Sequence, residues 1–309
     1  MGTPEFAVPS FEALCDAGHS VVAAVTQADR PRGRGRTPKP PPVKEAARRR
    51  GVEVWQPLRL RDEAFLERLR AAAPDLIAVV AYGKILPPAV IELPRLGCVN
   101  VHASLLPAYR GAAPINRAVM NGERRTGVTT MLMDEGMDTG PVLLQREVDI
   151  GEEETAGELA RRLAALGAKL LCETVGALAS GGLKPVPQDH SRATYAPMLT
   201  REESRIDWSL PARVIADRVR GLSPRPGAFT TLGGRILKIH AGRTGGREAK
   251  GAAPGEIVAV TDDAIEVATG EGTYLITRLQ AENRKCMDTS EFLRGRKVKA
   301  GERLGGPQG

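Results

Sequence analysis

The sequence lacks the short motifs that mark several common kinds of enzyme. It has no Ser or Cys in a G-x-S-x-G setting, no Walker phosphate loop and no G-x-G-x-x-G after an expected strand. It also has no triad of residues at metal-ligand spacing, so we expect no metal. These absences favour direct transfer of a group between two bound substrates, without a covalent enzyme intermediate.

Long apolar runs and paired cysteines are missing as well. No stretch is long enough to cross a bilayer, and no charged-then-apolar signal segment opens the chain. We therefore expect a cytoplasmic protein with no membrane partner. Cys15, Cys98, Cys172 and Cys286 lie far apart without C-x-x-C spacing, which predicts four reduced packing residues rather than a zinc site or a redox pair.

The first two thirds of the chain alternate short apolar runs with helical stretches. This pattern predicts a mainly parallel, Rossmann-like sheet covered by helices. A helix is expected over residues 63–72, and a longer one begins at Thr155, which forms a capping box with Glu158. The expected strands cover residues 21–26, 76–81, 98–101 and 128–133.

A proline-containing stretch without periodicity separates this region from the last third of the chain. The 309 residues exceed the usual size of one domain, and we place a first domain at 1–183, a linker at 184–203 and a second domain at 204–309. Several short strands at close spacing predict a small OB-like β-barrel for the second domain. The expected elements are a helix over 212–221 and strands over 229–232, 236–239, 256–260, 265–268 and 273–279.

Positive charge is concentrated in two parts of the sequence. The formal net charge is +7. Residues 29–50 carry nine Arg or Lys against two Asp or Glu, and residues 203–309 carry eighteen against thirteen. This distribution suits a polyanionic partner such as nucleic acid. Two solvated basic faces would explain the same clustering.

Asn100 and His102 end an apolar run and are spaced i, i+2. In an extended chain these side chains point the same way. At the carboxyl end of a strand in an α/β sheet, both would face the ligand crevice. Asn can donate to a developing oxyanion, and His can exchange a proton near neutral pH. A polar strand end with no catalytic role would show the same pair.

Asp138 stands in the stretch GMDTG at residues 136–140. The flanking glycines allow unusual backbone torsions that could bring the carboxylate close to another loop. Beside His102, that carboxylate would fix the tautomer of the imidazole and stabilise its protonated form. A simple turn would also explain an Asp between glycines.

Four linked motifs carry a resemblance to a known family. They are VNVH at 99–102, SLLP at 104–107, RGAAPI at 110–115 and MDEGMDTG at 133–140. Together with GTPEFA at 2–7, FLRGR at 292–296 and GERL at 301–304, they resemble the methionyl-tRNA formyltransferase family from nearly one end of the chain to the other. Motifs in this order over two domains are highly specific.

The resemblance implies a reaction and its participants. A methionyl amine esterified to initiator tRNA would attack the formyl carbon of 10-formyltetrahydrofolate, the formyl donor, through a tetrahedral intermediate. The family's catalytic group falls on Asn100, His102 and Asp138. Its folate site falls on Ser104, Leu105, Leu106 and Pro107. The partners implied are initiator methionyl-tRNA and folate, and we expect a monomer.

The family's basic tRNA-contacting loop falls on the N-terminal charged segment. By match, the contacts are Arg30, Arg32, Arg34, Arg36 and Lys39, with Arg34 at the position that the family uses on the tRNA acceptor end. One departure concerns the second domain, where Arg225 stands between two prolines at a position that is usually Trp in the family.

A second departure concerns the start of the chain. The family has an apolar strand before Gly-Thr-Pro, whereas only Met1 precedes Gly2 here. An expected helix over residues 9–16 leads into the strand 21–26, and a right-handed βαβ unit needs a strand before such a helix. We therefore expect the first strand to be missing from this chain, and either a functional start upstream of Met1 or an impaired protein.

Three other functions share part of the pattern. A glycinamide ribotide formyltransferase would share the Asn-His-Asp group but would need neither the basic loop nor the second domain. An amino-sugar nucleotide formyltransferase can carry a similar second domain. A non-catalytic RNA-binding protein would have no need of all three polar residues.

Overall fold

The computed structural model describes residues 1–32, 37–247, 249 and 251–306, and the chain divides into two compact units. The first unit contains Met1–Pro114, Arg125–Asp149 and Ala160–Ala196. The second contains Ile115–Arg124, Ile150–Leu159 and the chain from Pro197 onward. Residues 184–196 thus belong to the first unit and 197–203 to the second, and the domain boundaries placed at 183 and 203 stay predictions.

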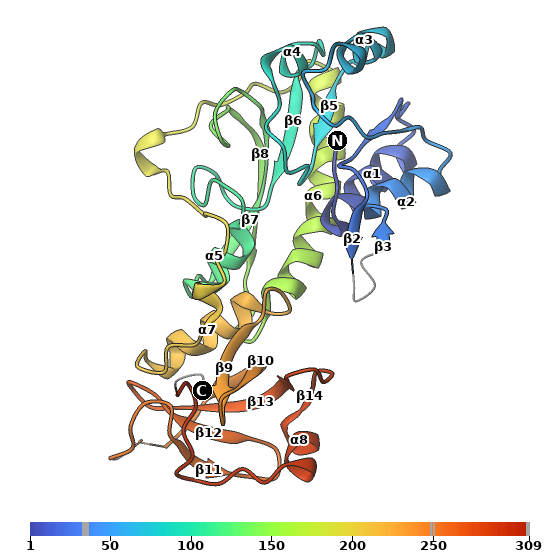
Figure 1. Cartoon of the computed structure of the whole chain (residues 1–309). Coiled ribbons are helices and arrows are strands. Elements are labelled where there is room, and N and C mark those ends of the chain that lie inside the picture. The colour runs from blue at the N-terminus through green and yellow to red at the C-terminus, as the bar shows by residue number, and fades with distance from the viewer. Residues whose placement is uncertain (33–36, 248, 250, 307–309) are drawn as a thin grey trace. The chain divides into compact units, whose positions relative to one another are not determined.

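Among its described residues, the first unit has one four-stranded mixed sheet and two separate strand pairs (Figure 1). Its strands are β1 (Ala24–Val25), β2 (Arg30–Arg32), β3 (Thr37–Lys39), β4 (Val54–Trp55), β5 (Ile77–Val79), β6 (Cys98–His102), β7 (Arg125–Leu132) and β8 (Val142–Asp149). The expected parallel α/β arrangement is confirmed in the pairs β1·β4 and β5·β6. β7 and β8 continue the sheet in antiparallel fashion, in the order β5-β6-β7-β8. Residues 133–141 alone join β7 to β8, and a parallel pair needs a connection of about a dozen residues or more.

Helices surround these strands. They are η1 (Glu5–Ala7), α1 (Val8–Asp16), α2 (Pro42–Arg49), α3 (Glu63–Ala72), α4 (Pro88–Ile91), α6 (Ala156–Ala179) and η2 (His190–Arg192), of which α6 begins in residues of the second unit. α3 has the predicted bounds and buries Phe65, Leu66 and Leu69. The predicted capping box is also confirmed, because the Thr155 N–H donates to Glu158 and the Glu158 N–H donates back to Thr155 Oγ1.

β1 is shorter than the predicted strand over residues 21–26, because only Ala24 and Val25 find strand partners. On the other side of β1, the first two residues of the chain join it to β5. Gly2 donates to Val25 O over 3.0 Å, and Met1 O accepts from Val80 N over 2.9 Å. Residues 19–23 run past this point without pairing in any strand.

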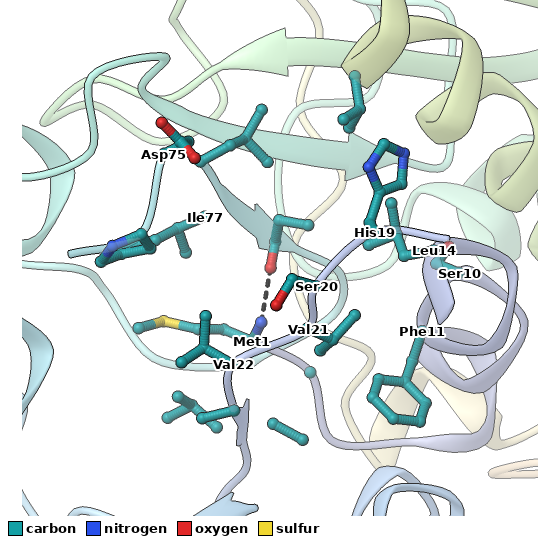
Figure 2. A pocket seen from close by; sticks show the side chains of 18 of the residues that line it. Met1, Ser10, Phe11, Leu14, His19, Ser20, Val21, Val22, Asp75 and Ile77 are labelled. Atoms are coloured by element: carbon teal, nitrogen blue, oxygen red, sulfur yellow. Dashed lines mark hydrogen bonds between the residues drawn. The ribbon is translucent and has the colours of Figure 1, made fainter. Parts of the chain in front are cut away.

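A groove lies beside this junction within the first unit. It has a volume of about 460 Å³, and Phe11, Leu14, Val22 and Ile77 are among the apolar side chains that line it. Figure 2 shows Met1 beside Ser20–Val22, with its ammonium group bound to a backbone oxygen of β5. That oxygen belongs to Ala78 and lies 2.5 Å from the ammonium nitrogen.

The second unit is an antiparallel β domain with helices at its edges. Its elements are α5 (Pro114–Met120), η3 (Glu202–Ser204), α7 (Ala212–Leu222), β9 (Ala228–Leu232), β10 (Arg235–Thr244), β11 (Ile257–Val260), β12 (Ile265–Ala268), β13 (Thr273–Ala281), β14 (Met287–Asp288) and α8 (Thr289–Gly295), with α5 beginning at the last residue assigned to the first unit. The strand order is β11-β12-β13-β10-β9, with β14 beside β13. Gly233 and Gly234 both have positive φ, as a two-residue hairpin between β9 and β10 requires.

The last described segment bridges the two edge strands of this sheet. Leu304 pairs with Leu232 of β9, and Arg303 pairs with Glu256 just before β11. The core inside includes Trp208, Ile239, Ile257 and Tyr274 among its buried members. A five-strand antiparallel path whose edges are joined by a sixth segment agrees with the predicted OB-like domain.

The described cysteines are all free thiols, as expected. Cys98 is buried in β6, and its burial raises the pKa of the thiol to about 12. Cys286 is exposed, so the prediction that all four cysteines pack in the interior is wrong for this residue. It lies in the connection between β13 and β14.

Candidate active site

Asn100 and His102 lie at the carboxyl end of β6, which runs between β5 and β7. Asn100 Nδ2 donates to Asp138 Oδ1 over 3.3 Å. His102 Nδ1 lies 3.6 Å from the same oxygen. The structure therefore brings the three predicted catalytic residues together at a single carboxylate.

Asp138 reaches β6 because its own backbone is unusual. Its φ is +56°, in the left-handed region, whereas Gly136 and Gly140 are not at positive φ. The unusual backbone torsion is therefore that of Asp138 itself. The glycines instead allow the loop to pack closely against neighbouring atoms. A Cβ on Gly140 would lie 1.9 Å from Leu132 O, so no larger residue fits there. The Asp138 carboxylate is held from the far side by Gly111, whose N–H donates to Oδ2 over 2.8 Å.

The hydrogen bonds of His102 define which ring nitrogen carries a proton. Nε2 lies 2.9 Å from the backbone oxygen of Tyr109, which can only accept, so Nε2 is the donor. Nδ1 then faces the Asp138 carboxylate as a lone pair in the neutral ring and as an N–H in the cation. His102 is only 6% exposed, so both ring nitrogens face groups of the protein.

The stretch Ser104–Pro107 follows β6 as a firmly held loop. Ser104 Oγ donates to Ala108 O over 2.6 Å, and Leu106 N donates to Thr129 Oγ1 over 3.1 Å. Gln145 Nε2 donates to Leu106 O over 2.9 Å. Ser104 and Leu106 are buried by these contacts, while Leu105 and Pro107 stay half-exposed and give the loop an apolar outer face.

The basic segment forms a hairpin of β2 and β3. Arg30 is directly opposite Lys39, and Arg32 is opposite Thr37. Arg30 Nη2 donates to Gln27 Oε1 over 2.6 Å, and Lys39 is exposed. Two of the predicted tRNA contacts, Arg34 and Arg36, lie outside the described residues.

The hairpin is anchored at its base by Lys44, which is 8% exposed. Its ammonium group donates to both oxygens of Asp29, over 2.8 and 2.9 Å, and to Gln56 Oε1 over 2.7 Å. Gln56 Nε2 also donates to Asp29 Oδ1 over 2.9 Å. The hydrogen bonds that Asp29 accepts, first from Lys44 and then from Gln56, lower the pKa of its carboxyl from the ordinary value. Lys44 therefore supports the hairpin, and its charge is already paired.

The structure adds two polar residues that sequence reasoning missed. Arg110 and Gln188 are 2% and 7% exposed, and Arg110 Nη2 donates to Gln188 Oε1 over 2.7 Å. Arg110 stands inside the RGAAPI motif, so its place near the site could have been suspected. Gln188 falls in the stretch expected to be a linker, where no periodicity points to burial.

Within the part of the chain that the structure describes, His, Cys, Asp and Glu form no group that could hold a metal ion. Nor does any described helix combine the length and the apolar character that a membrane span requires. The groove of about 460 Å³ is lined by none of Asn100, His102 and Asp138, so it is a feature separate from the candidate active site.

The arrangement is that of a group-transfer enzyme, with a donor amide, an imidazole and a carboxylate at one strand end. Comparison with known proteins defines the class. Residues 1–175 match the family described as formyl transferase, and residues 198–297 match the formyl transferase C-terminal domain. The chain therefore belongs to the formyl transferase family.

Relatives of this chain indicate which formyl transferases it resembles most in sequence. The methionyl-tRNA formyltransferase of Pelobacter propionicus is 52% identical over 99% of this chain and 95% of its own length. That of Myxococcus xanthus is 50% identical over 97% and 95% of the two chains. The resemblance to methionyl-tRNA formyltransferases is thus confirmed by relatives along almost the whole chain.

Solved structures show the same fold at lower identity. An N-formyltransferase from Helicobacter canadensis, in complex with folinic acid and dTDP-3-aminofucose, matches with a TM-score of 0.63 at 17% identity and covers 91% of this chain and 97% of its own. HypX from Aquifex aeolicus, in complex with tetrahydrofolic acid, matches with a TM-score of 0.60 at 22% identity and covers 80% of this chain and 43% of its own.

Proposed function

We propose that the chain transfers the formyl group of 10-formyltetrahydrofolate to the free amino group of methionyl initiator tRNA, giving formylmethionyl-tRNA for translation initiation. The observation that carries this proposal is that Asn100 and His102 both lie beside the same carboxylate oxygen of Asp138. It occurs in a chain about half identical to methionyl-tRNA formyltransferases over nearly its whole length.

The chemistry needs a donor for the formyl oxygen and an acceptor for the amine proton. In the transfer, the methionyl nitrogen bonds to the formyl carbon, and the bond from that carbon to the folate nitrogen breaks. The proton that the amine releases moves to the folate nitrogen as that nitrogen leaves. Asn100 has two amide N–H groups. One reaches Asp138, and the other donates to the formyl oxygen as that oxygen becomes negative.

His102 and Asp138 handle the proton. The Asp138 carboxylate keeps two fixed donors around it, from Asn100 and Gly111, so it stays oriented while the charge on His102 changes. The imidazole is fixed on its other side by Tyr109 O. This arrangement lets the pair take up the amine proton and return it without moving either side chain.

The loop Ser104–Pro107 is the proposed folate contact. Its polar groups are bound within the protein, whereas Leu105 and Pro107 are half-exposed. An apolar face of this kind suits the flat ring system of a folate. Because Thr129 and Gln145 hold the loop from behind, the face is preformed.

The hairpin of β2 and β3 is the proposed contact with tRNA. Arg30 lies directly opposite Lys39, and like charges at directly opposite positions destabilise an antiparallel pair. A phosphate backbone beside them would offset that repulsion. The proposal assigns this contact to Arg30, Arg32, Arg34, Arg36 and Lys39.

We also propose that the enzyme acts as a monomer in the cytoplasm. Every residue invoked for the chemistry comes from one chain, so the site needs no second copy. Light scattering in solution tests this part, since a monomer has the chain mass of 33.0 kDa.

One substrate comparison tests the function. The protein is supplied with formyl-folate and, in separate reactions, with methionyl initiator tRNA, glycinamide ribotide or an amino-sugar nucleotide. We expect formylation of the tRNA alone. Formylation of an amino sugar or of the ribotide without tRNA would assign the same site to a different acceptor and reject the proposal.

A further inference from the structure

The carboxamide of Gln188 joins two loops of the proposed active site. Its Nε2 donates to the backbone oxygens of Asp138, over 2.9 Å, and Gly140, over 2.7 Å. Its Oε1 accepts from Nε and Nη2 of Arg110, over 3.2 and 2.7 Å. Only a neutral amide, with oxygen towards the guanidinium and nitrogen towards the carbonyls, satisfies all of these partners.

Arg110 leads from this amide back to the side chain of Asp138. The next residue is Gly111, whose N–H donates to Asp138 Oδ2 over 2.8 Å. The backbone of Arg110 is itself paired with residues 194–196. Asp138 is thus held at its carbonyl by Gln188 and at its carboxylate by Gly111, and Arg110 connects the two attachments.

This double attachment acts on a residue whose backbone would otherwise relax. A left-handed φ costs energy for residues other than glycine, less for Asp than for most, and the hydrogen bonds of Gln188 to this loop favour it at Asp138. We propose that Gln188 is a positioning residue for formyl transfer, which holds the backbone of Asp138 so that its carboxylate meets Asn100 and His102. The kinetic part of this inference rests on the proposed function, whereas its structural part does not.

Two substitutions distinguish the contribution of the Gln188 side-chain oxygen from that of its side-chain nitrogen. Gln188→Ala removes both, while Gln188→Glu keeps acceptors for Arg110 but sets carboxylate oxygens against the carbonyls of Asp138 and Gly140. We expect both variants to lower kcat by roughly 10- to 100-fold, with KM for tRNA and folate changed by less than about threefold. Normal kcat in Gln188→Glu would overturn the inference.

A matched control distinguishes positioning from loss of stability. Thr174 on α6 shares a buried hydrogen bond of 2.8 Å with Thr130 on β7, and Thr174→Val removes it. This variant should lower Tm about as much as Gln188→Ala while keeping kcat normal. An equal loss of kcat in Thr174→Val would show that general loosening explains the effect of Gln188.

Coupling to Asp138 gives a second kinetic criterion. If Gln188 acts through Asp138, then Gln188→Ala should cause no further loss of kcat in a protein that already carries Asp138→Ala. Losses that multiply in the double variant would mean that Gln188 works independently, which would overturn the inference.

Hydrogen exchange tests the positioning without any substrate. In Gln188→Ala, the Gly111 amide should exchange about tenfold faster, because its acceptor Asp138 is no longer held; in Thr174→Val its rate should stay unchanged. An unchanged Gly111 rate in Gln188→Ala would overturn the inference. Failure of the unaltered protein to formylate methionyl-tRNA would instead reject the proposed function, and the Gly111 rate would still decide the structural claim.

Discussion

At the carboxyl end of β6, the polar side chains of the candidate site have hydrogen-bond partners within the protein, whereas along the groove beside β5 a buried hydroxyl has none among the described residues. His102 and Asp138 each have bonded neighbours within the protein. In the groove, Ser10 Oγ is buried and has no partner among the described residues, and the Met1 amino group is buried at the edge of β5 with Ala78 O as its acceptor. We therefore expect substitutions in the first region to affect activity most, and changes in the second to affect stability most.

The largest expected effect comes from breaking the network at β6. His102→Ala and Asp138→Ala should each lower kcat by roughly 10²- to 10⁴-fold, because each removes a proton-transfer or charge-stabilising group. Unfolding free energy should fall more for His102→Ala than for Asp138→Ala, because the His102 side chain is buried and its removal leaves a cavity. Steady-state kinetics and urea unfolding of the same preparations measure both quantities.

The double variant tests whether the two residues act as one unit. If they do, it should be scarcely slower than the poorer single variant. Two losses that multiply would count against a coupled pair. Folate binding, measured by titration, should stay nearly normal in all three proteins and serves as the control for an intact site.

The basic hairpin is a third kind of region, in which charge should affect binding but neither chemistry nor stability. Replacing Arg32, Arg34 and Arg36 with Ala should raise KM for tRNA by about 10- to 100-fold and reduce its salt dependence, because fewer phosphate counterions are released. Folate affinity should not change. Arg59→Ala with Arg61→Ala, at two exposed positions before α3, is the matched control. If KM for tRNA depends on salt as steeply in the hairpin variant as in the unaltered protein, these arginines do not contact tRNA.

The sequence pattern predicted correctly those helices and hairpins whose hydrogen bonds join residues close together in the chain. α3 has its predicted bounds because Phe65, Leu66 and Leu69 repeat at helical spacing, and Pro74 follows. The hairpin at Gly233 and Gly234 was predictable because its two glycines are adjacent. In the site, the i, i+2 spacing of Asn100 and His102 was enough to predict that both side chains lie on one face of their strand. That Asp138 lies beside them was predicted from the family resemblance.

Strand pairing, burial and backbone torsions that depend on residues far away in the sequence could not be predicted from local pattern. Residues 21–23 have strand-like composition, yet they form no strand, because pairing depends on what lies beside them. Gln188 is buried by Arg110 and by the Asp138 loop, which are far away in sequence. The positive φ of Asp138 was expected of its glycine neighbours, since sequence gives no sign of which residue in a tight loop takes the strained torsion.

The groove beside β5 provides a test in the opposite direction, towards higher stability. Adding Ile-Val-Ile-Val before Met1 should place an extended segment between β1 and β5, where it can bury apolar side chains and pair with backbone groups of both strands. We expect a gain of about 3 kcal/mol in unfolding free energy, a rise of several degrees in Tm and unchanged kcat. A Gly-Ser-Gly-Ser extension is the control. Equal Tm for the two extensions would mean that the groove does not accept a strand.

The smallest predicted effect is a pH dependence from the Met1 amine. Burial lowers the pKa of this group from 8.0 to about 6. Between pH 6 and pH 8 the amine is therefore neutral in the folded state and still protonated in the unfolded state. Since the unfolded state binds more protons, unfolding free energy should rise with pH across this window, by at most about 2.7 kcal/mol.

Acetylation of the amine isolates this contribution from that of every other titratable group, because it changes the terminus alone. The acetylated terminus keeps an N–H for Ala78 O but carries no charge, so its stability should rise less steeply between pH 6 and pH 8. Urea midpoints of the two forms at both pH values measure the difference. Parallel pH profiles would show that the amine reaches water in the folded state, and the contrast between the groove and the end of β6 would then rest on Ser10 Oγ and Trp55 Nε1, two buried groups of the groove lining that have no partner among the described residues.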